Sequence, residues 1–206
     1  MADDEVRAAV VAERREQAEL LAGLDAGQWD APSLCAGWRV REVIAHSTMQ
    51  YRMSMPRFAL ELLKARGNFN RLADRQAKAD AAALSSDELV AALRDNAEHP
   101  WTPPGGGQVG ALSHDVIHGL DVTVALGVDR TVPERVGLVL AGMKPKNVAF
   151  FGTDLSGVSL EATDLDWRYG EGEPVRGTGA DLLLVVCGRK LPAGRLDGGP
   201  ADRFTG

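Results

Sequence analysis

The segment Gly110-Ala-Leu-Ser-His-Asp-Val-Ile-His-Gly-Leu-Asp-Val-Thr-Val-Ala-Leu126 has a helical pattern and carries two histidines, His114 and His118. Side chains four residues apart lie on the same face of an α-helix, so both imidazoles can point toward one position. The chain has only four histidines, and His46 on a separate predicted helix can supply a third imidazole. Three neutral imidazoles on rigid helices, with an open position left over, are typical of a catalytic divalent-metal site.

Two aspartates near this pair have different expected roles. Asp121 follows His118 by three residues, so its carboxylate can orient an imidazole by accepting the second ring N–H; a solvent-facing charge is the alternative. Asp115 points about 100° away from His114 around the helix, and we expect it to be a charge near the helix start. His99, beside a proline at a predicted helix end, is expected to be a capping or surface residue.

Composition and charge are those of a globular chain. A length of 206 residues, with 45% hydrophobic and 25% charged residues, suits one domain plus a small appendage. The net charge of −6 argues against nucleic acid or an anionic membrane as the main partner, because both require a basic face. No apolar run of about 18 residues exists and the N-terminus is acidic, so we expect no membrane span and no secretory signal. Cys35 and Cys187 are far apart in sequence, which suits a reducing cytoplasm.

Helical patterns occupy the first two thirds of the chain. Apolar spacing predicts a helix over roughly residues 3–24, and a second helix that opens near Arg39 and carries His46. Met49 and Met53 lie about one turn beyond His46, so we expect them to wall a pocket.

Three shorter signals mark further helix boundaries. Pro56 predicts a kink or a fresh helix start. The residues Ser85-Ser-Asp-Glu88 form a potential capping box at the start of a third helix that ends near His99. Pro133 suits the first turn of another helix.

The pattern changes from about residue 153. Alternating apolar and polar residues over 158–162 predict a half-buried strand, and residues 174–177 predict a second short strand. Thr178 can cap a helix over residues 179–187. The tail from Leu191 is expected to be a loosely held terminus.

These patterns predict a mainly α protein with two parts. Residues 1–152 are expected to form a metal-binding helical bundle, and residues 153–206 a small C-terminal α/β region.

Several motifs occur together in a characteristic order. Trp29 and Pro32-Ser-Leu-Cys-Ala-Gly-Trp-Arg-Val-Arg-Glu-Val-Ile-Ala-His46 come first, and His118-Gly-Leu-Asp121 follows on the later helix. The stretches 163–172 and 179–189 complete the set in the C-terminal region. In this combination the chain resembles the mycothiol-dependent maleylpyruvate isomerase family, part of the DinB-like superfamily.

The resemblance implies a DinB-like four-helix bundle of the up-down-down-up type, with a small C-terminal domain. It also implies a divalent metal, usually zinc, held between helices, with His46 matching the first ligand and His118 the last. The isomerase itself has a glutamate where this chain has His114, whereas other DinB-like relatives have three histidines. That difference keeps the metal site and weakens the transfer of the particular substrate.

The expected chemistry follows from the charge of the site. Three neutral ligands leave the full double positive charge of the ion at the open position, and a thiol bound there loses its proton at neutral pH. The thiolate can add to an activated double bond, open an epoxide or displace a leaving group. The resemblance implies that this thiol is mycothiol. We therefore expect a metal-dependent thiol transferase or isomerase, with His46, His114 and His118 acting catalytically through the metal.

Two arginines are candidates for binding the cofactor or substrate. Arg189 follows the predicted C-terminal helix and could anchor a carboxylate by a two-pronged contact; a cation complementing the helix C-terminus is the alternative. Arg52, near the face of His46, is the second candidate. Zinc is the expected metal, and nickel or iron also suit imidazole ligands.

Two other functions fit the same residues. The metal site could serve a biosynthetic or detoxification enzyme that uses no thiol cofactor, or the chain could be a non-enzymatic, metal-stabilised binding or stress protein. For the leading function, the expected partners are a low-molecular-weight thiol and a small electrophile. We expect the protein to be a monomer or a homodimer.

Overall fold

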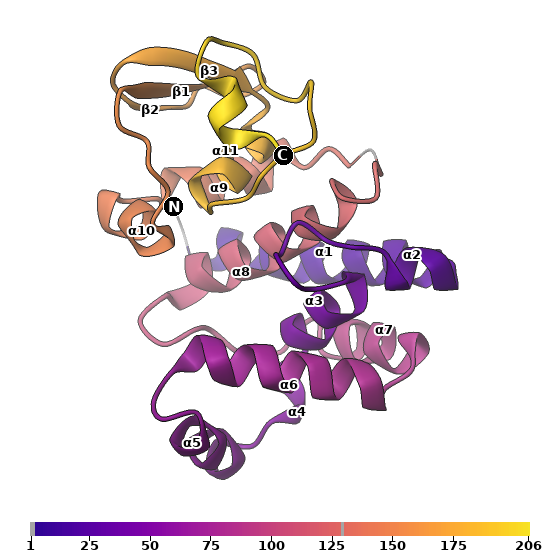
Figure 1. Cartoon of the computed structure of the whole chain (residues 1–206). Helices are drawn as coiled ribbons and strands as arrows, with labels where there is room; N and C mark the ends of the chain where they lie inside the picture. The colour runs from indigo at the N-terminus through magenta and orange to yellow at the C-terminus, as the bar shows by residue number, and fades with distance from the viewer. Residues whose placement is uncertain (1–2, 129) are drawn as a thin grey trace. The chain divides into compact units, whose positions relative to one another are not determined.

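The computed structural model describes residues 3–128 and 130–206, and the chain divides into two compact units, Met1–His118 and Gly119–Gly206. The first unit is helical (Figure 1). Its helices are α1 (Asp3–Ala22), α2 (Ala26–Asp30), α3 (Val40–Ser47), α4 (Met49–Arg52), α5 (Met55–Lys64), α6 (Phe69–Ala83), α7 (Ser86–Asp95) and the first three turns of α8 (Gly107–Thr123).

Helix α1 forms where the sequence predicts it and packs against α7, while α3 packs against α6. The inner face of α1 includes Val6, Val10 and Leu21, which are at most 3% exposed. The same face also buries Arg14 and Gln17. Buried polar side chains require hydrogen-bond partners inside the protein, so we expect Arg14 and Gln17 to bind groups on neighbouring helices.

A new helix starts at Pro56, as predicted: α4 ends at Arg52, and α5 begins at Met55 with Pro56 in its first turn. Met49 joins a buried apolar cluster with Ala65 and Leu72, and Met53 packs against it. The expectation that these two methionines wall a pocket beside His46 is therefore wrong: they fill the core between α4, α5 and α6.

Helix α6 is absent from the sequence-based prediction. Asn68 caps it, since its side-chain oxygen accepts a hydrogen bond from the Arg71 N–H at 3.0 Å. The buried face consists of Leu72, Gln76 and small alanines, so the apolar periodicity is weak although alanine favours the helix. A cap followed by alanine-rich sequence was the available signal.

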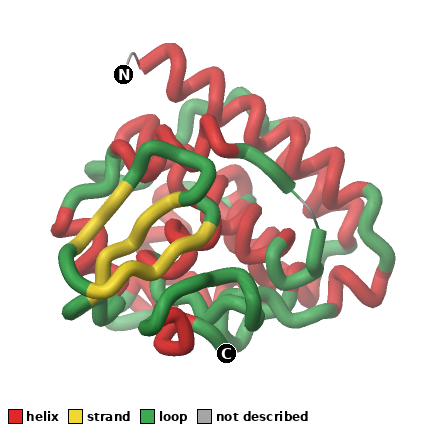
Figure 2. Tube along the Cα trace, turned by 90° about the horizontal axis from the view of Figure 1, so that it is seen from above, coloured by secondary structure: helices red, strands yellow, loops and turns green. Residues whose placement is uncertain are grey.

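The second unit contains a small sheet covered by helices. Strands β1 (Val158–Ala162), β2 (Arg168–Gly170) and β3 (Glu173–Gly177) lie in the order β2-β1-β3 and are seen clearly in Figure 2. β1 pairs antiparallel with β2 and parallel with β3. The helical elements are α9 (Pro133–Ala141), α10 (Pro145–Phe151), α11 (Gly179–Val186) and a 3-10 helix (Ala201–Phe204), in addition to the last turn of α8.

Helix α11 is the centre of this unit. Its residues Leu182–Val186 are all 0% exposed, and the helix packs against α9, β1 and β3. Thr178 caps it as predicted, accepting a hydrogen bond from the Asp181 N–H at 3.2 Å. Gly179 leaves space at the start of the helix, because a Cβ there would lie 2.4 Å from the Leu165 side chain and would force that side chain to shift.

The C-terminal tail corrects the prediction of a loosely held terminus. Leu191 pairs with Thr205, and Asp197 pairs with Arg176 of β3. Leu191, Leu196 and Phe204 are at most 7% exposed. The tail is held because these scattered apolar residues complete the core of the unit, a pattern without periodicity in the sequence.

The mainly helical architecture with a small C-terminal sheet is confirmed. The boundary expected between residues 152 and 153 stays a prediction; strands begin after it, whereas α9 and α10 belong to the same compact unit as the sheet. Among the residues that the structure describes, no helix combines the length and apolarity needed to cross a membrane.

The Ser85 capping box yields a stability prediction. Ser85 Oγ accepts a hydrogen bond from the Glu88 N–H at 3.2 Å, and Glu88 Oε2 accepts one from the Ser85 N–H at 2.8 Å. Ser85→Ala should lower the free energy of unfolding by about 1 kcal/mol, measured by urea denaturation, because the N–H of Glu88 loses its partner. Ser86→Ala, one residue into α7, is the matched control; equal effects of the two changes would contradict the assignment.

Candidate metal centre

The structure brings His46, His114 and His118 together within the first unit. His46 comes from α3 and is 8% exposed; the other two come from successive turns of α8. The ring centroids of His46 lie 5.4 Å from His114 and 5.0 Å from His118, and those of His114 and His118 are 4.8 Å apart. The pairing predicted from the i, i+4 spacing is therefore present.

The donor atoms of this trio fit a common cation. One ring nitrogen from each histidine lies within 4.8 Å of the others. Tetrahedral zinc with bonds of about 2.1 Å separates its nitrogen ligands by about 3.4 Å, so small side-chain rotations close the site. Three protonated rings this close would repel one another, whereas three neutral rings can share one ion.

His114 is oriented by a carboxylate that the sequence analysis assigned to another task. Its Nδ1 lies 3.0 Å from Oδ1 of Asp115, which is 3% exposed. A neutral imidazole that donates from Nδ1 leaves the Nε2 lone pair available to a metal. The expectation that Asp115 is a helix-start charge turned away from His114 is wrong, because this carboxylate is buried and contacts the imidazole directly.

Helix α1 holds Asp115 in place. Arg14, 0% exposed, donates from Nε to Asp115 Oδ2 at 2.7 Å and from Nη1 to the His99 carbonyl at 2.8 Å. Gln17 donates to the main-chain carbonyl of Asp115 at 2.6 Å. Removing one member of a buried charge pair costs about 3–5 kcal/mol, so this contact strongly restrains the position of α8.

Tyr51 packs beneath this pair, with the Arg14 guanidinium 5.5 Å from its ring centroid. Burial, together with the negative charge of Asp115, raises the pKa of Tyr51 to about 12, although Arg14 acts in the opposite direction. The phenol therefore stays neutral at physiological pH and adds no charge to the Arg14–Asp115 pair.

Aromatic side chains flank the histidines. The Trp38 ring lies 5.1 Å from His46, and the Trp101 ring lies 5.3 Å from His114. Trp38 is fixed by donating from Nε1 to Asp74 Oδ1 at 2.9 Å. These indoles limit the freedom of two of the three imidazoles and provide apolar surface beside them.

Cys35 lies next to His118, with 3.9 Å between its Sγ and His118 Nδ1. It belongs to the turn before α3 and is half-buried. A thiol is a weak donor and acceptor, so this contact is a weak restraint on the His118 ring. The proximity could not be read from the sequence, because 83 residues separate the two side chains.

Arg52 lies close to the chain segment that carries His46. Its guanidinium donates to Asp80 Oδ2 at 2.9 Å and to the Ala45 carbonyl at 2.7 Å. Burial lowers the pKa of Arg52, and the charge of Asp80 partly offsets that effect. These contacts hold Arg52 against the last turn of α3, at the residue before His46. A ligand-binding role for Arg52 stays a prediction.

Arg189 and Asp121 belong to the second unit and bind each other. The Arg189 Nε and Nη2 atoms each lie 2.8 Å from one oxygen of Asp121. Arg189 Nη1 also donates to the Cys187 carbonyl at 2.8 Å, the contact expected of a cation at the end of α11. The role of Arg189 as a carboxylate anchor stays a prediction.

The fourth histidine, His99, is exposed, and its Nδ1 accepts a hydrogen bond from the Trp101 N–H at 3.1 Å. It lies outside the histidine trio, in keeping with its expected capping or surface role.

Fold and geometry together define the class of this protein as a mainly helical protein with a candidate three-histidine metal centre. Residues 10–113 match the family model described as the mycothiol maleylpyruvate isomerase N-terminal domain. The chain belongs to this family. The matched segment contains His46 and ends one residue before His114.

Solved structures extend the likeness to the full fold. A crystal structure of the mycothiol-dependent maleylpyruvate isomerase aligns over 98% of this chain and 94% of its own, with a TM-score of 0.62 and 15% identity. A histidine-to-alanine mutant of that isomerase aligns over the same shares with a TM-score of 0.60. At this identity the likeness concerns the fold alone. No curated protein sequence matches the chain.

Asp115→Asn tests the contact that orients His114. An amide cannot accept the imidazole N–H with the strength of a carboxylate, so the zinc affinity should fall by about 10–100-fold, measured by competition with a chromogenic chelator. Asp95→Asn, an exposed change on α7, is the matched control. A zinc affinity equal to that of the unmodified protein, with circular dichroism showing a folded variant, would contradict this role.

Proposed function

We propose that this protein is a metal-dependent enzyme that uses mycothiol to isomerise or conjugate small electrophiles. The observation that carries the proposal is the convergence of three imidazole nitrogens within 4.8 Å of one another, with a buried carboxylate on the second nitrogen of His114. Membership of the isomerase family supports the thiol-dependent part of the proposal.

His46, His114 and His118 would hold the ion, which is zinc in the proposal, with nickel or iron as alternatives that suit the same ligands. A bound divalent ion supplies positive charge that favours a thiolate over a thiol near neutral pH. The rest of the chemistry depends on the residues that surround the proposed metal position.

The residues of the chain orient the ligands and shape the space beside them. Asp115 keeps the His114 proton on Nδ1, and Arg14 keeps Asp115 in place. Trp38 and Trp101 lie beside His46 and His114, where their rings can exclude water from an electrophile. Positioning and desolvation are thus the contributions that this chain can make.

A thiolate at this site could isomerise an activated alkene or form a thioether with an alkylating substrate. If sulfur adds to one alkene carbon, the former double bond rotates, and elimination restores the alkene and the thiol, giving isomerisation without a further reactant. If sulfur instead displaces a leaving group, a carbon–sulfur bond forms and the group departs with its electron pair, giving a thioether. We propose Arg52 and Arg189 as binding groups for a carboxylate of the substrate or thiol, by exchange with Asp80 and Asp121.

The same imidazole set also fits a metal enzyme that activates water and needs no thiol. The two functions differ in whether the binding of mycothiol depends on the bound metal. Mycothiol should raise the melting temperature of the zinc-loaded protein and not of the metal-free protein, because only a thiol-binding centre couples the two ligands. A shift that does not depend on zinc would point away from thiol activation.

His118→Ala tests the metal centre. The variant should lose bound zinc, measured by elemental analysis of untagged protein, and should lose thiol consumption with epoxides, halobimanes or maleyl-type acids. His99→Ala is the matched control, because His99 is exposed and outside the trio. Retention of stoichiometric zinc in His118→Ala would exclude this site, and absence of thiol consumption by the zinc-loaded wild type would exclude the enzyme proposed.

His114→Glu tests the charge of the ligand set. A carboxylate ligand offsets one unit of the positive charge, so the variant should still bind zinc but show a pH profile for thiol consumption displaced to higher pH. His114→Gln, which supplies an oxygen donor without charge, is the control. An unchanged profile in His114→Glu would show that ligand charge does not set the thiol ionisation.

A further inference from the structure

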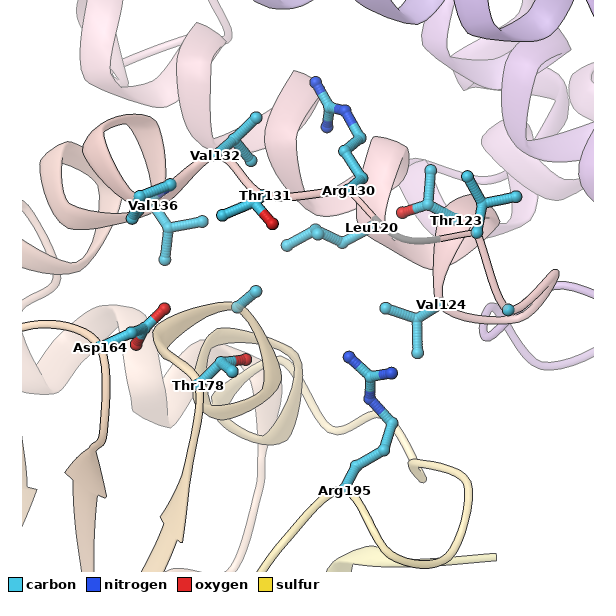
Figure 3. A pocket seen from close by; sticks show the side chains of 14 residues that line it. Leu120, Thr123, Val124, Arg130, Thr131, Val132, Val136, Asp164, Thr178 and Arg195 are labelled. Carbon is cyan, nitrogen blue, oxygen red and sulfur yellow. The ribbon is translucent and has the colours of Figure 1, made fainter.

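A cavity of about 320 Å³ lies within the second unit, bordered by the end of α8, the start of α9 and the first turn of α11 (Figure 3). We propose that it binds a small carboxylate with an aliphatic tail, with Arg195 holding the carboxylate. Its volume falls at the lower end of the range of small-molecule sites. The inference concerns a second ligand site and does not depend on the function proposed for the histidines.

Aliphatic side chains form one part of the wall of the cavity. Leu120 and Val136 are 1% exposed, and Val124 and Val132 are 6% and 8% exposed. Ala180 on α11, which has a small side chain, also lines the cavity. Such a surface gains free energy by taking up an apolar chain from water.

Arg195 is held in a defined position at this cavity. Its Nε donates to Asp181 Oδ1 at 2.6 Å, and Asp181 is buried and accepts from the Thr178 hydroxyl at 2.7 Å. Among the described residues, no hydrogen bond is formed by the two terminal nitrogens of Arg195. Figure 3 shows these nitrogens directed toward the side of the cavity formed by Val124. A planar fork with two free NH2 groups suits a carboxylate.

Two further charged residues among those that the structure describes, Asp164 and Arg130, line the cavity. Asp164 Oδ1 accepts a hydrogen bond from the Gly179 N–H at 2.6 Å, so this carboxylate stabilises the N-terminus of α11. The Arg130 side chain extends away from the centre of the cavity in Figure 3. The terminal nitrogens of Arg195 favour a monoanion, and the aliphatic part of the wall favours a carboxylate with a tail over inorganic phosphate.

The cavity and the histidines use different faces of α8. Leu120, Thr123 and Val124 follow His118 by two, five and six residues. At about 100° per residue they lie about 200°, 140° and 240° around the helix from His118. Occupation of the cavity should therefore be independent of metal at the histidine centre.

The test is a titration of metal-free protein with hexanoate, followed by NMR of methyl groups. Signals of Leu120, Val124, Val132 and Val136 should shift, and affinity should rise by about fourfold per methylene from acetate to hexanoate. Hexanol, which has the tail without the charge, should bind at least about tenfold more weakly than hexanoate.

Variants separate this cavity from other carboxylate sites. Arg195→Gln should weaken hexanoate binding about tenfold or more, whereas Arg176→Gln, which removes an exposed arginine of β3 paired with Glu161, should leave it unchanged. His46→Ala should also bind hexanoate normally. If Arg195→Gln fails to fold, Ala180→Leu provides the test, because filling the cavity should abolish the gain from acetate to hexanoate.

Several results would overturn the proposal. These are an absence of methyl shifts, equal binding of hexanol and hexanoate, and unchanged binding by folded Arg195→Gln. Loss of hexanoate binding in His46→Ala would place the carboxylate at the histidine centre instead. None of these results would alter the zinc content or thiol consumption expected of the wild type, so the two proposals can fail separately.

Discussion

The buried ion pair between Arg14 and Asp115 is the contact on which the candidate centre depends. It joins α1 to α8, and the second oxygen of the same carboxylate meets His114. Both charges are almost fully removed from water, so neither can lose its partner without a large loss of stability. Orientation of the imidazole is thereby tied to the packing of two helices that are distant in sequence.

This coupling explains why so much polar material lies inside the bundle. Gln17 binds the Asp115 carbonyl, Arg14 also binds the His99 carbonyl, and Tyr51 packs against Arg14 as a neutral phenol. A fully apolar interior would hold the helices equally well but would leave His114 free to rotate. The buried polar network instead favours one arrangement, in which ring nitrogens of three histidines converge.

Local sequence predicted the elements whose signals are local. The Ser85 capping box, Pro56 at a helix start, the alternation over residues 158–162 and the Thr178 cap all act within a few residues, so propensity and hydrogen bonding suffice. Helix α6 and the ordered tail after Leu191 escaped prediction. Their stability comes from small or scattered apolar residues, which contribute only when distant segments of the chain bury them.

The sequence by itself determined the histidine pair on one helix face, the mainly helical class, the small sheet and the family resemblance. Those features depend on spacing along the chain. Only the tertiary structure decided that Asp115 contacts His114, and that Arg189 and Arg52 are engaged by carboxylates. The reason is physical: a buried charge takes whichever partner the packed helices bring within hydrogen-bonding distance, and that choice is made across many tens of residues.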